Sequence, residues 1–307
     1  MSFADWVRES KRAIATKGVK EGSLESARDF HYGLLRNVET ALADNGLNVG
    51  ENVLDREWDV LVVADGCRYD LMAETAPEYP FLSEPEPFTS IAGGSLSWMR
   101  RTFTATRDLS DVAYVTANPF SSRALGGVDF AVMDEVWRYA WDDAAGTVRA
   151  ADVTDAAIET LRGRDVDRAI VHYMQPHHPF VPQQLAAGIN RENPTEHDTT
   201  VWEKLRDGDV ERETVWDAYR ANLKYVLDSI ADLRENVDAP RMAITADHGN
   251  ALGEWGIYGH GDYPIGALRT VPWCTTTASD ERTIDPDVNR RETDVSVTEQ
   301  LRDLGYR

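Results

Sequence analysis

The chain has 307 residues, and its acidic residues outnumber its basic residues 53 to 32, which gives a formal charge of −21. This charge disfavours nonspecific binding to nucleic acid or to an anionic membrane. Two cysteines are too few for a disulfide scaffold or a thiolate metal cluster, and no run reaches the roughly 20 apolar residues that span a bilayer.

These features predict a soluble, cytoplasmic protein with no nucleic-acid partner and no integral membrane segment. The acidic residues are spread through the chain, and lysines are few. Such a surface is typical of proteins that stay soluble in high salt, as in halophilic archaea, because salt screens the repulsion between like charges.

Residues 1–50 predict a helical extension ahead of the main domain. Apolar residues such as Phe3 and Ile14 recur at helical spacing and indicate two helices that are broken at Gly18 to Gly22. Basic residues in this stretch are compatible with a peripheral contact to lipid or to a partner, but acidic residues interrupt the basic face. We expect an accessory element packed on a catalytic domain that comprises residues 51–307.

The next stretch predicts a strand that ends in a carboxylate. The apolar run Val60-Leu-Val-Val-Ala64 is typical of a buried parallel strand, and Asp65 follows it directly. Taken alone, Asp65 is more typical of a cap on the following helix, a common use of aspartate. Further on, Gly93-Gly94 precedes Ser95 and Ser97, either of which opens a predicted helix. A hydroxyl there suits a nucleophile that holds an anion, although serine is also a common N-cap.

Further elements follow in the order expected of an α/β domain. They are strands at 111–116 and 130–133, a helix at 152–163 and a strand at 167–174. The last strand runs into His177-His178, which two prolines present stiffly for binding an anion or a metal. His172 lies inside the strand and is expected in the core.

The C-terminal half alternates loop, helix and strand patterns. Residues 183–209 lack periodicity and suggest an insertion or a lid, with His197 exposed to solvent. A strongly amphipathic helix is predicted at 214–234. The apolar run Ala243-Ile-Thr-Ala246 then leads into Asp247-His248, and His260 follows twelve residues later. Residues 270–277 suit an edge strand because they contain Pro272. Residues 294–304 are predicted to form a terminal helix.

The polar residues at the strand ends predict a metal site. Parallel strands deliver their C-terminal ends to one edge of a sheet, where open α/β folds bind ligands. Carboxylate oxygen and imidazole nitrogen favour zinc or manganese, and calcium or magnesium also fit. Asp65, Asp247 and His248 supply three ligands besides the oxygen of Ser95, or alternatively Ser97. The metal would lower the pKa of that hydroxyl and screen the charge of the substrate.

Three histidines remain for the substrate. His177, His178 and His260 would bind the outer oxygens of a transferred group or protonate its leaving group. One metal with substrate-binding histidines, and two metals that share His177 and His260, both fit this set of residues.

At these motifs the sequence resembles the alkaline phosphatase superfamily, in particular its sulfatase-like branch with the phosphoethanolamine transferases and lipoteichoic acid synthases. The resemblance runs from Trp58 to the C-terminus and is carried by Val60-Leu-Val-Val-Ala-Asp65, Tyr173-Met-Gln-Pro-His-His-Pro-Phe180, Thr245-Ala-Asp-His-Gly249 and Tyr258-Gly-His-Gly261. It implies an α/β fold, a three-layer α/β/α sandwich with a mostly parallel central sheet. It also implies that Asp65, Asp247 and His248 bind metal and that His177 and His260 face the substrate.

The resulting hypothesis is a metal-dependent hydrolase or transferase of phosphate or sulfate esters, acting through a covalent serine intermediate on a small-molecule or glycan substrate. A true sulfatase is the first alternative, although the Cys-x-Pro-x-Arg or Ser-x-Pro-x-Arg signature of formylglycine formation is missing. The second alternative is a noncatalytic relative that binds a glycan or a protein partner.

Overall fold

The structure is a computed structural model that describes residues 3–44, 50–104, 107–186 and 199–290. Its centre is a seven-stranded sheet with the order β2-β11-β8-β1-β7-β3-β4. The strands from β8 to β4 in this order run parallel, and β11 is antiparallel to both of its neighbours. The strands are β1 Val60–Ala64, β2 Glu86–Thr89, β3 Leu109–Thr116, β4 Phe130–Glu135, β7 Arg168–Tyr173, β8 Ala239–Thr245 and β11 Thr270–Ala278.

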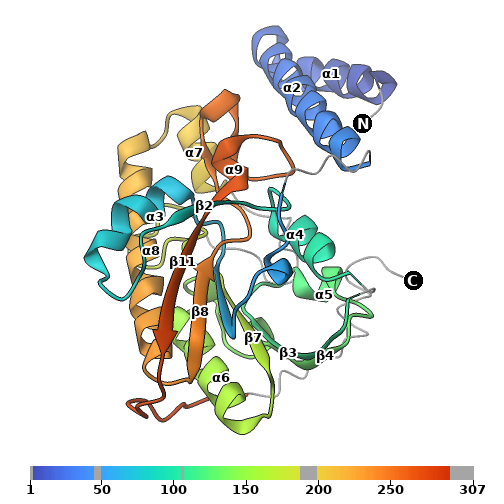
Figure 1. The fold of residues 1–307 in the computed structure, drawn as a ribbon. Coiled ribbons are helices and arrows are strands. Elements are labelled where there is room, and N and C mark those ends of the chain that lie inside the picture. Colours follow the sequence, from blue (N-terminus) through green and yellow to red (C-terminus); the bar gives the residue numbers. More distant parts are fainter. Residues whose placement is uncertain (1–2, 45–49, 105–106, 187–198, 291–307) are drawn as a thin grey trace.

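Helices cover both faces of this sheet, which confirms the predicted three-layer fold. Figure 1 shows α3 and α8 on one side of the sheet and α4 and α5 on the other, and α6 packs with α8. Two small hairpins, β5 Trp141–Asp142 with β6 Thr147–Val148 and β9 Ala251–Leu252 with β10 Tyr258–Gly259, lie outside the main sheet. The helices are α1 Phe3–Lys17, α2 Val19–Asp44, α3 Tyr69–Thr75, α4 Ser95–Thr102, α5 Ser121–Ala124, α6 Ala150–Gly163, α7 Val201–Asp207, α8 Arg212–Arg234 and α9 Gly266–Arg269.

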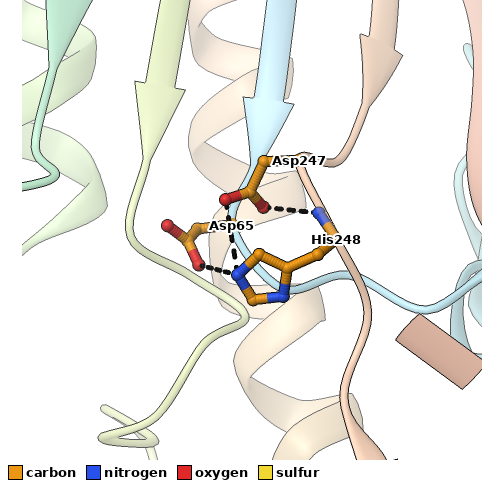
Figure 2. A group of neighbouring side chains, drawn as sticks. All are labelled: Asp65, Asp247 and His248. Atoms are coloured by element: carbon orange, nitrogen blue, oxygen red, sulfur yellow. Dashed lines mark hydrogen bonds and ion pairs between the residues drawn. The ribbon is translucent and has the colours of Figure 1, made fainter. Parts of the chain in front are cut away.

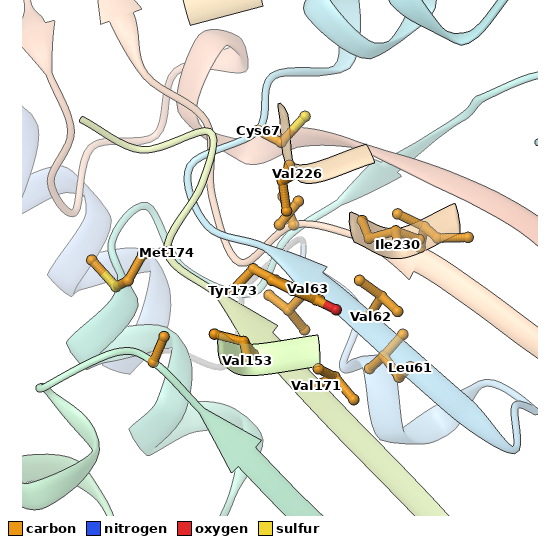
Figure 3. Packing of buried hydrophobic residues seen from close by; sticks show 14 of the residues in the cluster. Leu61, Val62, Val63, Cys67, Val153, Val171, Tyr173, Met174, Val226 and Ile230 are labelled. Carbon is orange, nitrogen blue, oxygen red and sulfur yellow. The ribbon is translucent and has the colours of Figure 1, made fainter. Parts of the chain in front are cut away.

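The core explains why β1 is apolar along its whole length. All five residues of β1 are buried, since helices cover both faces of the sheet. Figure 3 shows Val62 and Val63 among side chains from α6 and α8, including Val153 and Val226. This packing makes β1 a rigid base for the residue that follows it, Asp65.

The N-terminal extension is a helical hairpin. The break between α1 and α2 is confined to Gly18, whose φ of +84° is unfavourable for residues with a side chain. The second half of α2 contacts the main body, where Glu39 forms buried ion pairs with Arg101 and Arg269. Figure 1 shows both helices projecting away from the sheet. No helix in the described ranges is long and apolar enough to cross a membrane.

One expectation about local structure was wrong, and one stretch contains a helix that was not predicted. Strand β11 is not an edge strand, because β2 pairs with its first half and β8 with its second half. Pro272 is tolerated because it lies in the half that pairs with β2 only. The stretch 183–209 also contains a helix, α7, which a capping box between Thr200 and Glu203 stabilises. The predicted helix 294–304 and His197 lie outside the described residues.

Candidate active site

The predicted site residues come from strands that are neighbours in the sheet. Strand β1 lies between β7 and β8, and all three are parallel. Their C-terminal ends therefore meet at one edge. Asp65 follows β1, His177 and His178 follow β7, and Asp247 and His248 follow β8. The topology thus brings together Asp65 and the Asp247-His248 pair, which lie far apart in the chain.

Asp65, Asp247 and His248 form a buried cluster whose ligand atoms lie within 4.8 Å of one another (Figure 2). His248 Nε2 is 3.7 Å from Asp65 Oδ1 and 3.4 Å from Asp247 Oδ2. Both of these carboxylate oxygens are buried and accept no hydrogen bond within the described structure. Buried anionic oxygens without partners are costly, so the cluster fits a bound cation.

Hydrogen bonds fix the orientation of the side chains in the cluster. The backbone N–H groups of Gly66 and His248 both donate to Asp247 Oδ1 at 2.9 Å, which leaves Oδ2 facing the cluster. His248 Nδ1 donates to the Gly249 carbonyl at 2.8 Å, so the lone pair of a neutral ring is on Nε2. Each ligand therefore presents a lone pair to the same point.

Electrostatics favour the charged form of Asp65. Burial raises the pKa of Asp65, but the His172 imidazole, whose Nε2 lies 3.4 Å from Asp65 Oδ2, and the other nearby histidines outweigh it and leave the pKa below its ordinary value. Burial lowers the pKa of His248, whereas Asp247 and Asp65 raise it above the ordinary value. A bound cation would replace the proton of His248, because both stabilise the same two carboxylates.

Of the two candidate serines, Ser95 contacts the cluster. Its Oγ is 3.2 Å from both Asp65 Oδ2 and His248 Nε2, and the residue is buried. Ser97 instead donates to Asp262 Oδ2 at 2.5 Å. Gly94 is the N-cap of α4, so Ser95 stands at the first helical position and does not cap the helix with its side chain.

Three histidines lie beside the cluster. The rings of His248 and His260 stack with centroids 4.5 Å apart, and His177 Nε2 is 2.9 Å from His260 Nε2. His177 Nδ1 donates to the backbone carbonyl of His178. The His178 ring stacks on that of His177 at 4.6 Å.

The pair formed by His177 and His260 is neutral at neutral pH. Burial lowers the pKa of His177 below its ordinary value. Burial, together with the neighbouring His248 and His177, lowers the pKa of His260 much further. Neutral imidazoles can accept a proton or bind a second cation.

A close backbone contact joins the loop that carries Ser95 to the loop that carries His260. The N–H of Gly261 donates to the Gly93 carbonyl at 3.0 Å. A β-carbon at position 93 would lie 2.3 Å from the Gly261 carbonyl oxygen, so only glycine fits there. The Gly93-Gly94 pair therefore positions the serine against the histidine.

Sequence reasoning missed two residues that support Asp65. His172 was expected as an ordinary core residue, yet its Nε2 is 3.4 Å from Asp65 Oδ2 and 3.9 Å from Asp247 Oδ2. Its Nδ1 is 2.7 Å from the Tyr114 hydroxyl. Asn118 also donates to Asp65 Oδ2. Asn118 follows β3 and shows the same signal as Asp65, a polar residue at a strand end, whereas nothing around His172 in the sequence distinguishes it.

Another buried side chain joins the loops after β1 and β8. Arg68 donates to both carboxylate oxygens of Asp70, to Glu254 at 2.7 Å and to the backbone carbonyl of Asn250 at 2.9 Å. Asn250 donates in turn to the Gly66 carbonyl at 3.1 Å. Because Asp65 and Asp247 lie on these two loops, the network holds their carboxylates at a fixed separation.

A pocket of about 420 Å³ opens above Ser95, Asp65 and the histidines. Its outer wall comes from segments that sequence analysis did not assign to the site. Tyr32 of α2 lines it, as do Trp202 and Arg206 of α7 and Tyr258 beside His260. The N-terminal extension and the region of the predicted lid therefore both contribute to the walls around a substrate.

Sequence comparisons find no matching protein family and no matching curated protein. Structural comparisons do find similar folds. The soluble domain of lipooligosaccharide phosphoethanolamine transferase A from Neisseria meningitidis matches with a TM-score of 0.51 and 16% identity, over 73% of this chain and 77% of that one. The integral membrane protein of the same name matches with a TM-score of 0.52 and 15% identity, over 91% of this chain.

This chain spans 59% of that membrane protein, which is less than two thirds of its length. A lipoteichoic acid synthase from Listeria monocytogenes gives a TM-score of 0.44 at 11% identity, over 74% of this chain and 66% of that one. The parallel sheet, its flanking helices and the two transferase matches show that the chain has the alkaline phosphatase-like fold that its strand-end motifs implied.

Proposed function

We propose that the protein is a metal-dependent phosphoester hydrolase or transferase that uses Ser95 as its nucleophile. The contact of Ser95 Oγ with both Asp65 and His248, at 3.2 Å each, carries this proposal. A nucleophile needs a group that lowers its pKa, and a cation held by the same two residues would lie next to the serine oxygen. Ser97 has no such contact, since its hydroxyl binds Asp262.

The residues fit a divalent metal by their chemistry. Two buried carboxylate oxygens without hydrogen-bond donors, one imidazole Nε2 and one hydroxyl are the hard and borderline ligands that zinc and manganese accept. When bound, the metal would lower the pKa of the Ser95 hydroxyl and neutralise charge on the phosphoryl oxygens. The periplasmic domain of EcEptC from Escherichia coli, a protein of similar fold, has been solved in complex with zinc.

The proposed reaction has two steps. Ser95 Oγ attacks the phosphorus, a bond forms between serine oxygen and phosphorus, and the bond from phosphorus to the leaving oxygen breaks. Water or an acceptor hydroxyl then attacks the phosphoserine, which releases Ser95 and yields the hydrolysed or transferred product. Two displacements at one centre split a difficult transfer into two easier ones.

The histidine pair would manage the proton. In the first step a neutral imidazole of the pair accepts the proton that Ser95 loses. The contact between His177 Nε2 and His260 Nε2 lets the pair relay a proton to the leaving oxygen, which lies on the opposite side of the phosphorus. In the second step the pair takes a proton from the attacking hydroxyl and returns one to Ser95. The lowered pKa values of both residues support this role, since each ring is neutral before the reaction begins.

Phosphate is preferred over sulfate because of the residues around the nucleophile. The signature that directs conversion of cysteine or serine to formylglycine has proline two residues after the modified position. Here Ser97 stands in that place. Ser95 therefore acts as an unmodified hydroxyl in our proposal.

The test compares Ser95→Ala with the matched control Ser97→Ala. With zinc or manganese present, p-nitrophenyl phosphate and bis(p-nitrophenyl) phosphate serve as substrates. We expect Ser95→Ala to fall below about one hundredth of the parent rate, because the covalent route is lost. Ser97→Ala should keep most of the activity. Mass spectrometry of acid-quenched parent enzyme should find phosphate on Ser95. Full activity in Ser95→Ala, with metal still bound, would overturn the assignment.

A further inference from the structure

Exposed apolar side chains gather at one end of the molecule. Among the described residues seven large apolar side chains are exposed, and five of them belong to α2. The sixth, Trp255, is 73% exposed, and its backbone carbonyl accepts a hydrogen bond of 2.9 Å from His31 of α2. Only Met133, on β4, lies elsewhere among these described residues. Scattered apolar residues are normal on a surface, but a cluster of this kind marks an interaction site.

Three of the five exposed apolar residues of α2 share a face without acidic residues. At about 100° per residue, Leu24, Leu34 and Val38 fall within a sector of about 80°. All five acidic residues of α2 lie at least about 100° from the centre of that sector. Lys20 lies in the sector, near the start of the helix. In a chain with 53 acidic residues, this face is apolar with a cationic end.

The charge of the hairpin differs from that of the body. Residues 3–44 contain seven basic and seven acidic residues, so the remainder of the chain carries the whole formal charge of −21. Lys11 and Arg12 of α1 are exposed, as is Lys20. The hairpin is therefore the part of the molecule that an anionic surface repels least.

Trp255 has an unusual conformation for an exposed tryptophan. Its φ of +55° places a bulky residue in the left-handed region, which is disfavoured for any residue with a β-carbon. Gly253 and Gly256, both at positive φ, flank it. The loop thus holds a large apolar ring in solvent at a conformational cost, a combination typical of functional positions.

The same surface borders the active-site pocket. Tyr32, one residue after His31, lines the pocket, and its hydroxyl donates to the Gly256 carbonyl at 2.9 Å. The Tyr32 ring also packs against Tyr263, with centroids 5.7 Å apart. A ligand on the outer face of α2 would therefore lie beside the pocket opening.

We propose that the outer face of α2 and Trp255 form a docking surface for the interface of a lipid bilayer. Leucine and valine side chains enter the boundary between head groups and acyl chains, lysine reaches lipid phosphates, and tryptophan prefers this boundary. A second copy of the chain fits less well, because it would bring together two bodies of charge −21. Docking would present the pocket to phosphoesters carried by lipids. This consequence rests on the proposed function, whereas the docking itself does not.

The test is flotation with vesicles of phosphatidylcholine, alone or mixed with phosphatidylglycerol, at low salt and at about 1 M salt. The double variant Leu34→Asp/Val38→Asp changes two exposed positions outside the active site. The matched control is Met133→Asp, which adds a negative charge at an exposed apolar residue that lies outside the proposed docking surface. Circular dichroism checks that each variant is folded.

We expect the parent protein and Met133→Asp to float with the vesicles. Binding to the anionic mixture should rise at about 1 M salt, where the screening length falls to about 3 Å and repulsion from the acidic body fades. The double variant should bind at least about tenfold more weakly, since two apolar side chains no longer leave water. Its turnover of soluble p-nitrophenyl phosphate should match the parent rate.

Three outcomes would overturn the proposal. The first is that the parent protein binds vesicles at neither salt concentration. The second is that the double variant binds vesicles as tightly as the parent protein. The third is that the parent protein forms a dimer that does not bind vesicles, and that this dimer dissociates in the double variant. The last outcome would assign the surface to self-association. Failure of the proposed function looks different, because p-nitrophenyl phosphate would then not be hydrolysed by the parent protein at all.

Discussion

Replacement of His172 by phenylalanine tests whether this buried histidine positions the carboxylates of the candidate metal site. His172 is fully buried, and its Nε2 lies near Asp65 and Asp247. The Tyr114 hydroxyl lies 2.7 Å from Nδ1, and donation from that hydroxyl would place the ring proton on Nε2, facing the two carboxylates. Phenylalanine keeps the ring volume and removes that donor. Loss of such an outer hydrogen bond weakens metal binding about 10- to 100-fold. The contacts of 3.4 and 3.9 Å are long, so we expect zinc binding to weaken about tenfold, which is about 1.4 kcal/mol of binding free energy.

The assay is a zinc titration in competition with a chromophoric chelator, which measures the zinc Kd without any substrate. Tyr114→Phe should weaken binding in the same direction but less, because it removes only the group that orients His172. An unchanged Kd in a folded His172→Phe protein would refute the reasoning. A loss of about a thousandfold or more would also refute it, since His172 would then be a direct ligand.

Three further predictions concern the loops and the metal. Gly93→Ala should lower kcat by more than about tenfold and reduce the Tm, because a β-carbon 2.3 Å from the Gly261 carbonyl forces two loops apart; a parent-like rate would contradict this. Burial raises the pKa of Glu254, but the hydrogen bond and charge of Arg68 outweigh it and leave the pKa below its ordinary value of 4.5. The ion pair therefore stabilises the fold above pH 4.5, and this stabilisation is lost as the pH falls through the pKa of Glu254 in the folded protein. In acid-unfolding curves Arg68→Met should therefore lose less stability than the parent below pH 4.5, and identical curves would contradict it. Zinc at about 100 times its Kd should raise the free energy of unfolding by about 2.7 kcal/mol in denaturant titrations, and Asp247→Asn should remove most of that gain; an equal gain in the variant would show that zinc binds elsewhere.

Much of the site follows from local sequence because parallel strands obey a simple geometry. An apolar run that stops at Asp65 predicts both a buried strand and a polar group at its C-terminal end. The same pattern holds for Asp247. Since β1 and β8 are adjacent and parallel, the two carboxylates had to meet once the strand order was set. The fold class and these two residues were therefore predictable from the sequence.

The choice between Ser95 and Ser97 needed the tertiary structure. Two residues along a helix turn the side chain by about 200°, so the two hydroxyls point in nearly opposite directions. The placement of α4 on the sheet decided which one faces Asp65 and which one faces Asp262. No pattern within the segment distinguishes these orientations.

The sequence by itself determined the strands, the residues at their ends and the chemistry that those residues can perform, because these depend on neighbours in the chain. Only the tertiary structure decided that His172 supports the carboxylates, that Tyr32 and Trp202 wall the pocket and that Trp255 stands beside α2. Each of these roles depends on a contact between segments distant in sequence. Such contacts follow from how helices and loops pack on the sheet, which local patterns do not encode.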